Sequence, residues 1–232
     1  MRISIIIPSF GQAQYLREAI DSALSQTYPS IEIIVVDDGS HDGSLEIAKS
    51  YGDKINLIVQ KNKGLASARN TGIMNSSPLS SYIFFLDADD FLLPHGIERI
   101  VENAKESNAD VICPSLICFD EEGNQRETIL LPEPNFSDFK EGNRLAYCCA
   151  YKRAALLEVG GYSPKMDVLG GWEDLWMHYA MLENGKKIIT IQQPLVMYRV
   201  KEQSMWKEAE KNKGALWAQI VKDFPSAVAH RK

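Results

Sequence analysis

The 232-residue sequence has no long apolar run and few cysteines. No stretch approaches the roughly 18–20 apolar residues that a membrane span needs, and the start, interrupted by Pro8, is too short for a signal-peptide core. The cysteines (Cys113, Cys118, Cys148 and Cys149) form no Cys-x-x-Cys motif. The last two are neighbours, which would point to opposite faces of a strand. We therefore expect buried free thiols in a reducing compartment and a cytoplasmic protein.

Basic residues are also in the minority, and several ligand-binding motifs are absent. Acids outnumber lysine plus arginine by 31 to 25, for a net charge of −6, which argues against a nucleic-acid partner because binding one needs a basic face. The lack of Gly-x-Gly-x-x-Gly after the first apolar run and of Gly-x-x-x-x-Gly-Lys-Ser/Thr argues against a dinucleotide-binding dehydrogenase and a P-loop NTPase. The histidines are too scattered for a zinc site.

The first half of the chain alternates apolar runs with amphipathic segments. We expect strands at residues 2–7, 31–36, 55–59, 82–86 and 109–113, with helices between them. Strands that are apolar throughout and separated by helices are typical of a parallel sheet covered on both faces. The sequence therefore predicts an α/β fold with a mostly parallel, Rossmann-like central sheet flanked by helices.

The second half has a different rhythm and predicts a mixed β/α region of the same domain. We expect a hairpin of strands 116–119 and 126–131, a surface loop over 132–143, strands at 145–151, 188–191 and 195–199, and helices at 153–159, 173–184 and 206–224. For the last helix three arrangements stay open. It packs on the domain, pairs with a second copy in a homodimer, or lies on a membrane surface.

Carboxylates gather where predicted strands end. The first strand is followed by Pro8-Ser9-Phe10-Gly11, the second by Asp37-Asp38-Gly39-Ser40 and the fourth by Asp87-Ala88-Asp89-Asp90. Ligands of open α/β sheets bind beyond the carboxyl ends of the strands. So many acids repel unless donors or a hard divalent ion hold them. The alternative is that each aspartate caps the turn or helix that follows it.

Motifs in this order resemble the family 2 glycosyltransferases. They are residues 4–10, Val35-Val36-Asp37-Asp38-Gly39-Ser40, Asn62-Lys63-Gly64-Leu65-Ala66-Ser67-Ala68-Arg69-Asn70-Thr71-Gly72, Phe85-Leu86-Asp87-Ala88-Asp89-Asp90, Gly170-Gly171-Trp172-Glu173-Asp174 and Tyr198-Arg199. The resemblance implies a GT-A fold, with a nucleotide-sugar-binding half (1–113), an acceptor-binding half (114–205) and a C-terminal helix and tail (206–232). It also implies an inverting transfer from a nucleotide-diphospho-sugar, assisted by Mn²⁺ or Mg²⁺.

The resemblance also assigns nucleotide-binding residues. Pro8 and Phe10 would line the base pocket, where an aromatic face can stack on a nucleobase. Asp38 would accept a hydrogen bond from the base, and Asp37 is the alternative for that role. An N–H group of uracil or guanine could donate to such a carboxylate, and we expect a UDP-sugar donor first, with thymidine and guanosine nucleotides as the alternatives.

The next two motifs would hold the sugar diphosphate. Lys63, Gly64 and Arg69 belong to the segment expected under the ribose and diphosphate, although Arg69 could instead pair with an aspartate. In the Asp-x-Asp motif, Asp89 would ligate the metal, with Asp87 nearer the ribose and Ala88 between them. The ion would neutralise charge on the leaving group.

The acceptor side follows from the later motif. Asp174 would be the general base that an inverting displacement needs, beside Glu173, and Trp172 would stack on an acceptor sugar or belong to the core. The alternative is that both acids only complement a helix N-terminus.

One position departs from the family pattern. Related enzymes often carry Tyr-Arg-x-His-x-x-Ser near the metal, and here Lys201 stands at the His position. A protonated ammonium cannot ligate a metal, but it can sit against a phosphate. We therefore expect Lys201 to contact the diphosphate, with a solvated surface lysine as the alternative.

The predicted function is an inverting, metal-assisted transfer of a sugar to a glycan or lipid-linked acceptor, at the inner face of the membrane if the protein associates with it peripherally. A sugar-phosphate nucleotidyltransferase is one rival, but it should carry a glycine-rich, basic loop after the first strand, and Pro8-Ser9-Phe10-Gly11-Gln12 is not one. The other rival is a non-catalytic nucleotide-sugar binding protein.

Overall fold

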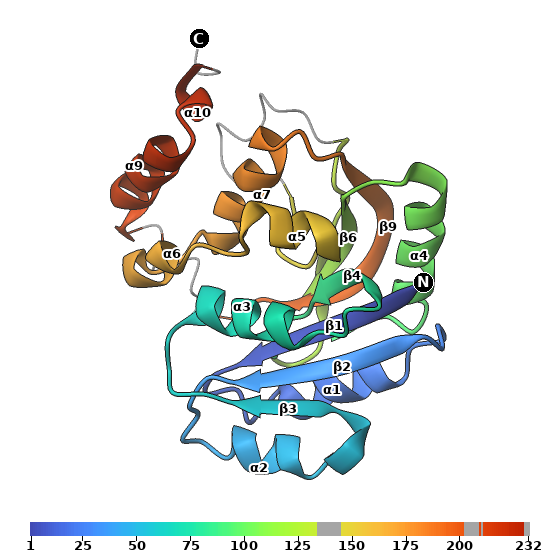
Figure 1. The fold of residues 1–232 in the computed structure, drawn as a ribbon. Helices are drawn as coiled ribbons and strands as arrows, with labels where there is room; N and C mark the ends of the chain where they lie inside the picture. Colours follow the sequence, from blue (N-terminus) through green and yellow to red (C-terminus); the bar gives the residue numbers. More distant parts are fainter. Residues whose placement is uncertain (134–144, 202–208, 210, 230–232) are drawn as a thin grey trace.

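A computed structural model describes residues 1–133, 145–201, 209 and 211–229. The described strands form one nine-stranded sheet of order β3-β2-β1-β4-β8-β6-β9-β5, with β7 pairing to β6. Helices cover both faces of this curled sheet (Figure 1). Among the described residues, none of the helices has the length and apolar character needed to cross a bilayer.

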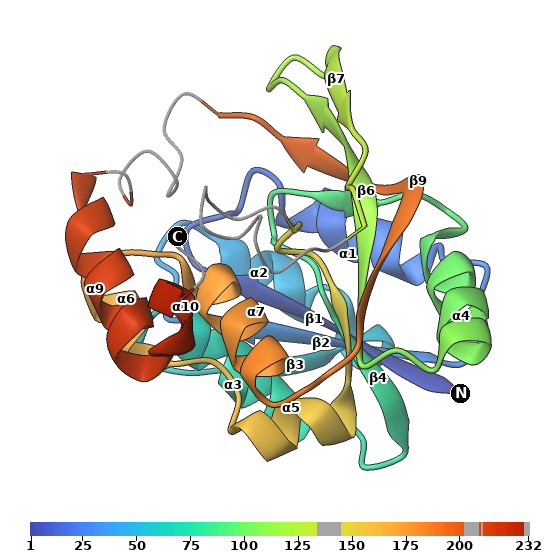
Figure 2. The ribbon, with the colours of Figure 1, turned by 90° about the horizontal axis from the view of Figure 1, so that it is seen from above.

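The N-terminal half is a parallel α/β unit. Its strands are β1 (Arg2–Ser9), β2 (Ile31–Asp37), β3 (Asn56–Val59) and β4 (Ser80–Phe85), paired in parallel around β1. They alternate with α1 (Leu16–Leu24), α2 (Ser44–Lys49), a 3₁₀ turn at Gly52–Lys54 and α3 (Leu65–Asn75). Figure 2 shows α1 and α3 on opposite sides of these strands. The centre of β1 is fully buried, as the unbroken apolar runs predict.

The second half of the chain extends the same sheet in mixed directions. Its elements are β5 (Phe91–Leu92), α4 (Gly96–Ser107), β6 (Val111–Phe119), β7 (Gln125–Ile129), β8 (Ala150–Lys152), α5 (Arg153–Val159), α6 (Pro164–Leu169), α7 (Glu173–Glu183), β9 (Ile188–Arg199), α9 (Lys213–Asp223) and α10 (Ser226–Ala229). β8 runs antiparallel to β4 and β6, whereas β9 runs parallel to β6. The predicted parallel sheet with a mixed second half is therefore present.

Several predicted element boundaries need correction. Residues 188–199 form one strand rather than two, with a register irregularity where Pro194, which has no amide hydrogen, lies opposite Ser115. The strand predicted over 145–151 is reduced to β8. The loop predicted at 132–143 and the first part of the helix predicted at 206–224 lie largely outside the described residues.

The C-terminal helix packs on the domain. Leu216 and Ile220 of α9 are buried, and the ring of Phe224, just after the helix, lies 5.2 Å from that of Trp176 on α7. The Trp176 Nε1–H group also donates to Asp223 at 2.9 Å. The predicted homodimer and membrane contact stay predictions.

The cysteine prediction is wrong for two of the residues. Cys113 and Cys149 form a disulfide, with their Cα atoms 4.4 Å apart, because the antiparallel pairing of Ile112 with Ala150 brings the next pair of residues face to face. Cys118 and Cys148 are buried free thiols, as expected.

Candidate functional site

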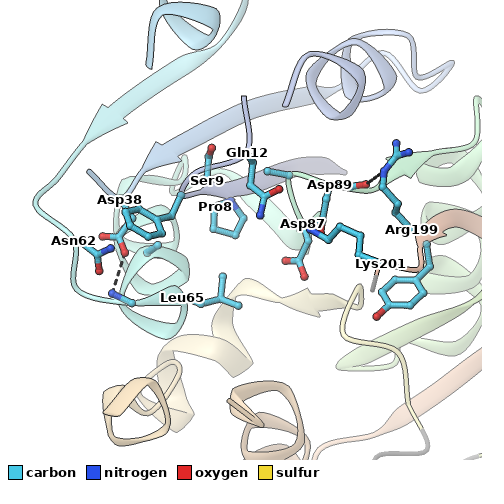
Figure 3. A pocket seen from close by; sticks show the side chains of 15 residues that line it. Pro8, Ser9, Gln12, Asp38, Asn62, Leu65, Asp87, Asp89, Arg199 and Lys201 are labelled. Atoms are coloured by element: carbon cyan, nitrogen blue, oxygen red, sulfur yellow. Dashed lines mark hydrogen bonds and ion pairs between the residues drawn. The ribbon is translucent and has the colours of Figure 1, made fainter. Parts of the chain in front are cut away.

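A cavity of about 460 Å³ opens at the carboxyl ends of β1, β2 and β4. The parallel strands bring these ends to one edge of the sheet, where ligands of open α/β sheets bind. The end of β9 completes the wall. The cavity is lined by Pro8, Ser9, Phe10, Gln12, Asp38, Asn62, Gly64, Leu65, Ala68, Asp87, Ala88, Asp89, Tyr198, Arg199 and Lys201 (Figure 3).

This cavity is lined by many of the residues predicted from the sequence, but others are not part of its lining. The predicted site residues that line it are Pro8, Phe10, Asp38, Gly64, Asp87, Ala88, Asp89 and Lys201. Those that do not are Asp37, Lys63, Arg69, Trp172, Glu173 and Asp174. Two lining residues, Gln12 and Asn62, were not predicted: Gln12 follows the first motif, and Asn62 opens a motif in which no role was assigned to it.

Asp38 organises the loop on one side of the cavity. Its carboxylate accepts hydrogen bonds from the backbone N–H groups of Lys63 and Gly64, at 3.0 and 2.9 Å, and from the Gln60 side chain at 2.7 Å. Within the described residues, the neighbouring Asp37 accepts only a long hydrogen bond, 3.3 Å, from the backbone N–H group of Ser40. Asp38, and not Asp37, lines the cavity, as does the half-exposed Phe10 ring.

A second aspartate fixes the start of α3 beside this loop. Asp167, on α6, accepts from the backbone N–H groups of Ala66 and Ser67, at 2.8 and 3.1 Å. Gly64 makes this approach possible, because its φ of +96° suits glycine and a Cβ there would overlap the Asp167 carboxyl group. Asp38 thus holds the backbone at Lys63 and Gly64, and Asp167 holds the start of α3 that follows.

The acidic cluster at the end of β4 could offer oxygen ligands to a cation. Carboxylate oxygens of Asp87, Asp89 and Asp90 lie within 4.8 Å of one another. Burial raises the pKa of Asp87 to about 6, although the Arg69 guanidinium opposes the shift. Burial, and then the charge of Asp89, raises the pKa of Asp90 well above its usual range.

Each carboxylate in this cluster is already engaged. Asp87 pairs with Arg69 at 2.8 Å, and Asp89 pairs with the ammonium of Lys201 at 2.5 Å. Asp90 accepts from the Tyr147 hydroxyl and, at 2.7 Å, from the backbone N–H of Arg199. Carboxylates are suitable ligands for Mn²⁺ or Mg²⁺. In this structure, however, Asp89 is paired with the Lys201 ammonium, and the cluster as folded does not fit a metal ion.

Arg69 lies behind the cavity wall and joins two motifs. It is fully buried, and its guanidinium pairs with Asp87 at 2.8 Å and with Glu173 at 2.7 Å. The rings of Tyr162 and Phe85 lie 5.2 and 5.9 Å from its Cζ atom. Arg69 therefore forms the ion pair that was predicted as one of its two roles, and Glu173 is one of its partners.

Asp174 lies at the start of α7, after an unusual backbone segment. Gly170, Gly171 and Trp172 all have positive φ, and Trp172 is one of two non-glycine residues in the described chain that do. Glycine adopts a positive φ without strain, whereas Trp172 does not, and residues in strained conformations cluster at functional sites. Burial, followed by the charge of Glu173, raises the pKa of Asp174 to about 7. A carboxylate with this pKa is poised to exchange a proton near neutral pH.

Two cations reach the cavity from the end of β9. The guanidinium of Arg199 lies between the rings of Tyr15 and Phe119, 4.4 and 4.3 Å from their centroids, and pairs with Glu18. Lys201, two residues further on, reaches into the cavity toward the acidic cluster (Figure 3). The cavity thus combines an aromatic ring, carboxylates and cations.

A family model and the similar curated proteins all point to glycosyltransferases. Residues 4–159 match the family Glycosyl transferase family 2. An uncharacterised glycosyltransferase of Rickettsia prowazekii is 50% identical over 111 residues, which cover 47% of this chain and 34% of that protein. The cholesterol galactosyltransferase of Borreliella burgdorferi is 37% identical over 138 residues, 58% of this chain and 38% of its own length. The chain therefore spans little more than a third of these relatives.

Solved structures show the same architecture. S. aureus TarS 1-349 in complex with UDP-GlcNAc superposes with a TM-score of 0.73 at 20% identity, over 95% of this chain and 67% of that one. The complex of the same protein with UDP gives a TM-score of 0.70 at 21% identity, over 93% and 65%. This likeness shows the fold, and the predicted fold class is confirmed.

Proposed function

The chain belongs to glycosyltransferase family 2, as its motifs indicated, and we propose that it transfers a sugar from a nucleotide-diphospho-sugar to a saccharide acceptor. One observation carries the proposal: a single cavity at the carboxyl ends of β1, β2 and β4 holds the Phe10 ring, Asp38 and the Asp87–Asp89 motif together. A base, a ribose and a diphosphate each find suitable chemistry there. UDP is the favoured nucleotide, in keeping with the UDP and UDP-GlcNAc complexes of TarS.

Asp38 and Phe10 would recognise the base. Asp38 is 3% exposed and lines the cavity, and an ionised carboxylate can accept several hydrogen bonds. It can therefore accept the imide N–H of uracil while it holds the loop. The aromatic ring of Phe10 is half exposed at the cavity wall. It offers an apolar face on which the base can stack.

Asp174 would take the proton of the acceptor hydroxyl. The hydroxyl oxygen forms the new bond to the anomeric carbon as the bond from that carbon to the diphosphate oxygen breaks, and the nucleoside diphosphate leaves with the bonding pair. Displacement from the face opposite the leaving group inverts the anomeric centre. A pKa near 7 suits this role, because the group is ionised above that pH and still basic enough to accept a proton.

The acceptor is proposed to be a glycan or a lipid-linked saccharide. The name of the B. burgdorferi relative, a cholesterol galactosyltransferase, is compatible with an acceptor carrying a lipid. Trp172, half-buried before Asp174 on the same backbone segment, is the side chain we propose for stacking on the acceptor. The Mn²⁺ or Mg²⁺ predicted from the sequence is not part of this proposal, because Asp87 and Asp89 are paired with Arg69 and Lys201.

The test separates donor binding from transfer. Thermal unfolding is measured with UDP, GDP, dTDP and CMP, and release of UDP from a panel of UDP-sugars is followed with and without saccharide acceptors. Asp174→Asn should retain UDP binding and lower turnover by at least about 100-fold, the usual contribution of a general base. Asp53→Asn, an exposed acid on the 3₁₀ turn, is the matched control and should leave both unchanged.

Two results would contradict the proposal. If none of the nucleotides raises the unfolding midpoint, the cavity is not a donor site, and the chain shares only its family and fold with glycosyltransferases. Nucleotide binding with equal turnover in wild type and Asp174→Asn would remove Asp174 from the reaction.

A further inference from the structure

Lys201 occupies the part of the cavity where the sequence predicts a metal ion. Its Nζ atom is 2.5 Å from Oδ2 of Asp89, and the two side chains are 18% and 21% exposed. Both residues line the cavity, and the side chain of Lys201 is directed inward (Figure 3). The ion pair is therefore part of the cavity lining, and Lys201 is not a solvated surface lysine.

The surrounding residues hold this ammonium in place. Arg199 is fixed by its ion pair with Glu18 and by its Nε–H group, which donates to the carbonyl of Asp89 at 2.9 Å. Lys201 follows that anchor closely, and its Nζ atom lies 5.3 Å from the ring centroid of Tyr15. The strand end and the acidic motif are thus tied together by side-chain and backbone contacts, with the ammonium facing the cavity.

A divalent ion would have to compete with this arrangement. A hard cation takes about six oxygen ligands, several of them carboxylates in a protein site, and the carboxylates available in the cluster are bonded to Arg69, Lys201 and Tyr147. An ion placed beside Asp89 would also meet the positive charge of Lys201. The residues present therefore supply a cation of their own where the family pattern has a histidine near the metal.

We propose that the Lys201 ammonium, held by Asp89, binds the diphosphate of the donor and offsets the charge of the leaving group in place of a divalent ion. An ammonium has three N–H donors, so it can keep its bond to Asp89 and donate to phosphate oxygens at the same time. The inference rests on the proposed function and concerns how the same cavity holds its donor.

Binding of UDP by calorimetry tests the inference, for the full chain in EDTA and in Mn²⁺. Wild type should bind UDP with affinities that agree within about threefold in the two conditions. In EDTA, Lys201→Met should bind UDP roughly 10- to 100-fold more weakly, the range for loss of a hydrogen bond to a charged group. Lys186→Met, which removes the ammonium of an equally short pair with Glu158 away from the cavity, is the control and should bind UDP as wild type does.

A second variant exchanges the ammonium for a potential metal ligand. Lys201→His should bind UDP weakly in EDTA, and Mn²⁺ should restore the affinity at least tenfold, because Asp89 and a neutral imidazole are then both available. Electron paramagnetic resonance of Mn²⁺ without nucleotide gives an independent readout. The variant should bind the ion more tightly than wild type. Unfolding midpoints of all variants verify that each one is folded, and Lys201→Gln replaces Lys201→Met if the latter is not.

The outcomes separate this inference from the proposed function. Wild type that binds UDP at least tenfold more tightly with Mn²⁺, or a folded Lys201→Met that binds as wild type does in EDTA, would overturn the inference and leave the donor site standing. Absence of UDP binding in every condition would overturn both.

Discussion

Replacement of Arg69 by methionine should destabilise the protein strongly. Arg69 is completely buried, and its guanidinium is held by Asp87 and Glu173, whose side chains are 25% and 9% exposed. Methionine fills much of the volume but leaves the two carboxylates without their cation. Breaking a buried pair by removing one partner costs about 3–5 kcal/mol, because the remaining charge is desolvated and unpaired.

The size of this effect can be measured by thermal and urea unfolding. In a chain of this length 1 kcal/mol corresponds to roughly 2–4 °C in the unfolding midpoint, so Arg69→Met should lower the midpoint by about 6–20 °C. Arg99→Met is the matched control. Arg99 pairs with Glu102 at 2.5 Å, but both side chains are 46% exposed, and exposed pairs contribute at most about 1 kcal/mol.

The loss should also depend on pH. The pKa of Asp87 is raised by burial to about 6 and held down by Arg69, so it rises further when Arg69 is removed. Above about pH 6 the wild type has an ionised, paired carboxylate, whereas the variant must bury an unpaired charge or take up a proton. Below that pH the Asp87 carboxyl is neutral in both proteins. The difference in unfolding free energy should therefore shrink from pH 8 to pH 5.

Two results would refute this reasoning. A midpoint for Arg69→Met within a few degrees of wild type would mean that the carboxylates find other donors or water. A large loss that is equal at pH 5 and pH 8 would mean that lost packing of the arginine stem, and not its charge, causes the effect.

Two further predictions follow from the same elements. The charge of Glu173 helps to raise the pKa of Asp174 to about 7. Glu173→Gln should therefore move the acid limb of the pH profile of kcat/KM to lower pH. A move to higher pH would show that another group controls this limb. Asp167 accepts hydrogen bonds from two N–H groups at the start of α3. Asp167→Ala should therefore lower the free energy of unfolding, measured in urea, by about 1–2 kcal/mol, as loss of a helix cap does. An unchanged free energy would mean that water replaces the cap.

The parallel half of the fold and the composition of the cavity could be predicted from the sequence. Apolar runs such as that of β1 have one stable solution, burial on both faces between helices, and this places Pro8, Asp38 and Asp87 at one sheet edge because parallel strands end together. The irregular second half was less predictable. Whether β9 is one strand or two depends on its pairing with β6, and local pattern does not reveal that pairing.

The partners of the site residues could not be predicted in the same way. Arg69 meets Glu173 across 104 positions of sequence, and Asp167 reaches the start of α3 across about as many. Residue type determined that each of these groups needs a partner when buried, since an unpaired charge in the interior is costly. It did not determine which partner.

The sequence by itself therefore determined the family, the parallel sheet and the set of chemical groups at its carboxyl edge, because these depend on local periodicity and on ordered motifs. Only the tertiary structure decided that Cys113 bonds to Cys149, that Glu173 is committed to Arg69 and that Asp89 is held by Lys201. Each of those contacts joins segments distant in the chain, and their meeting depends on how strands and helices pack against one another.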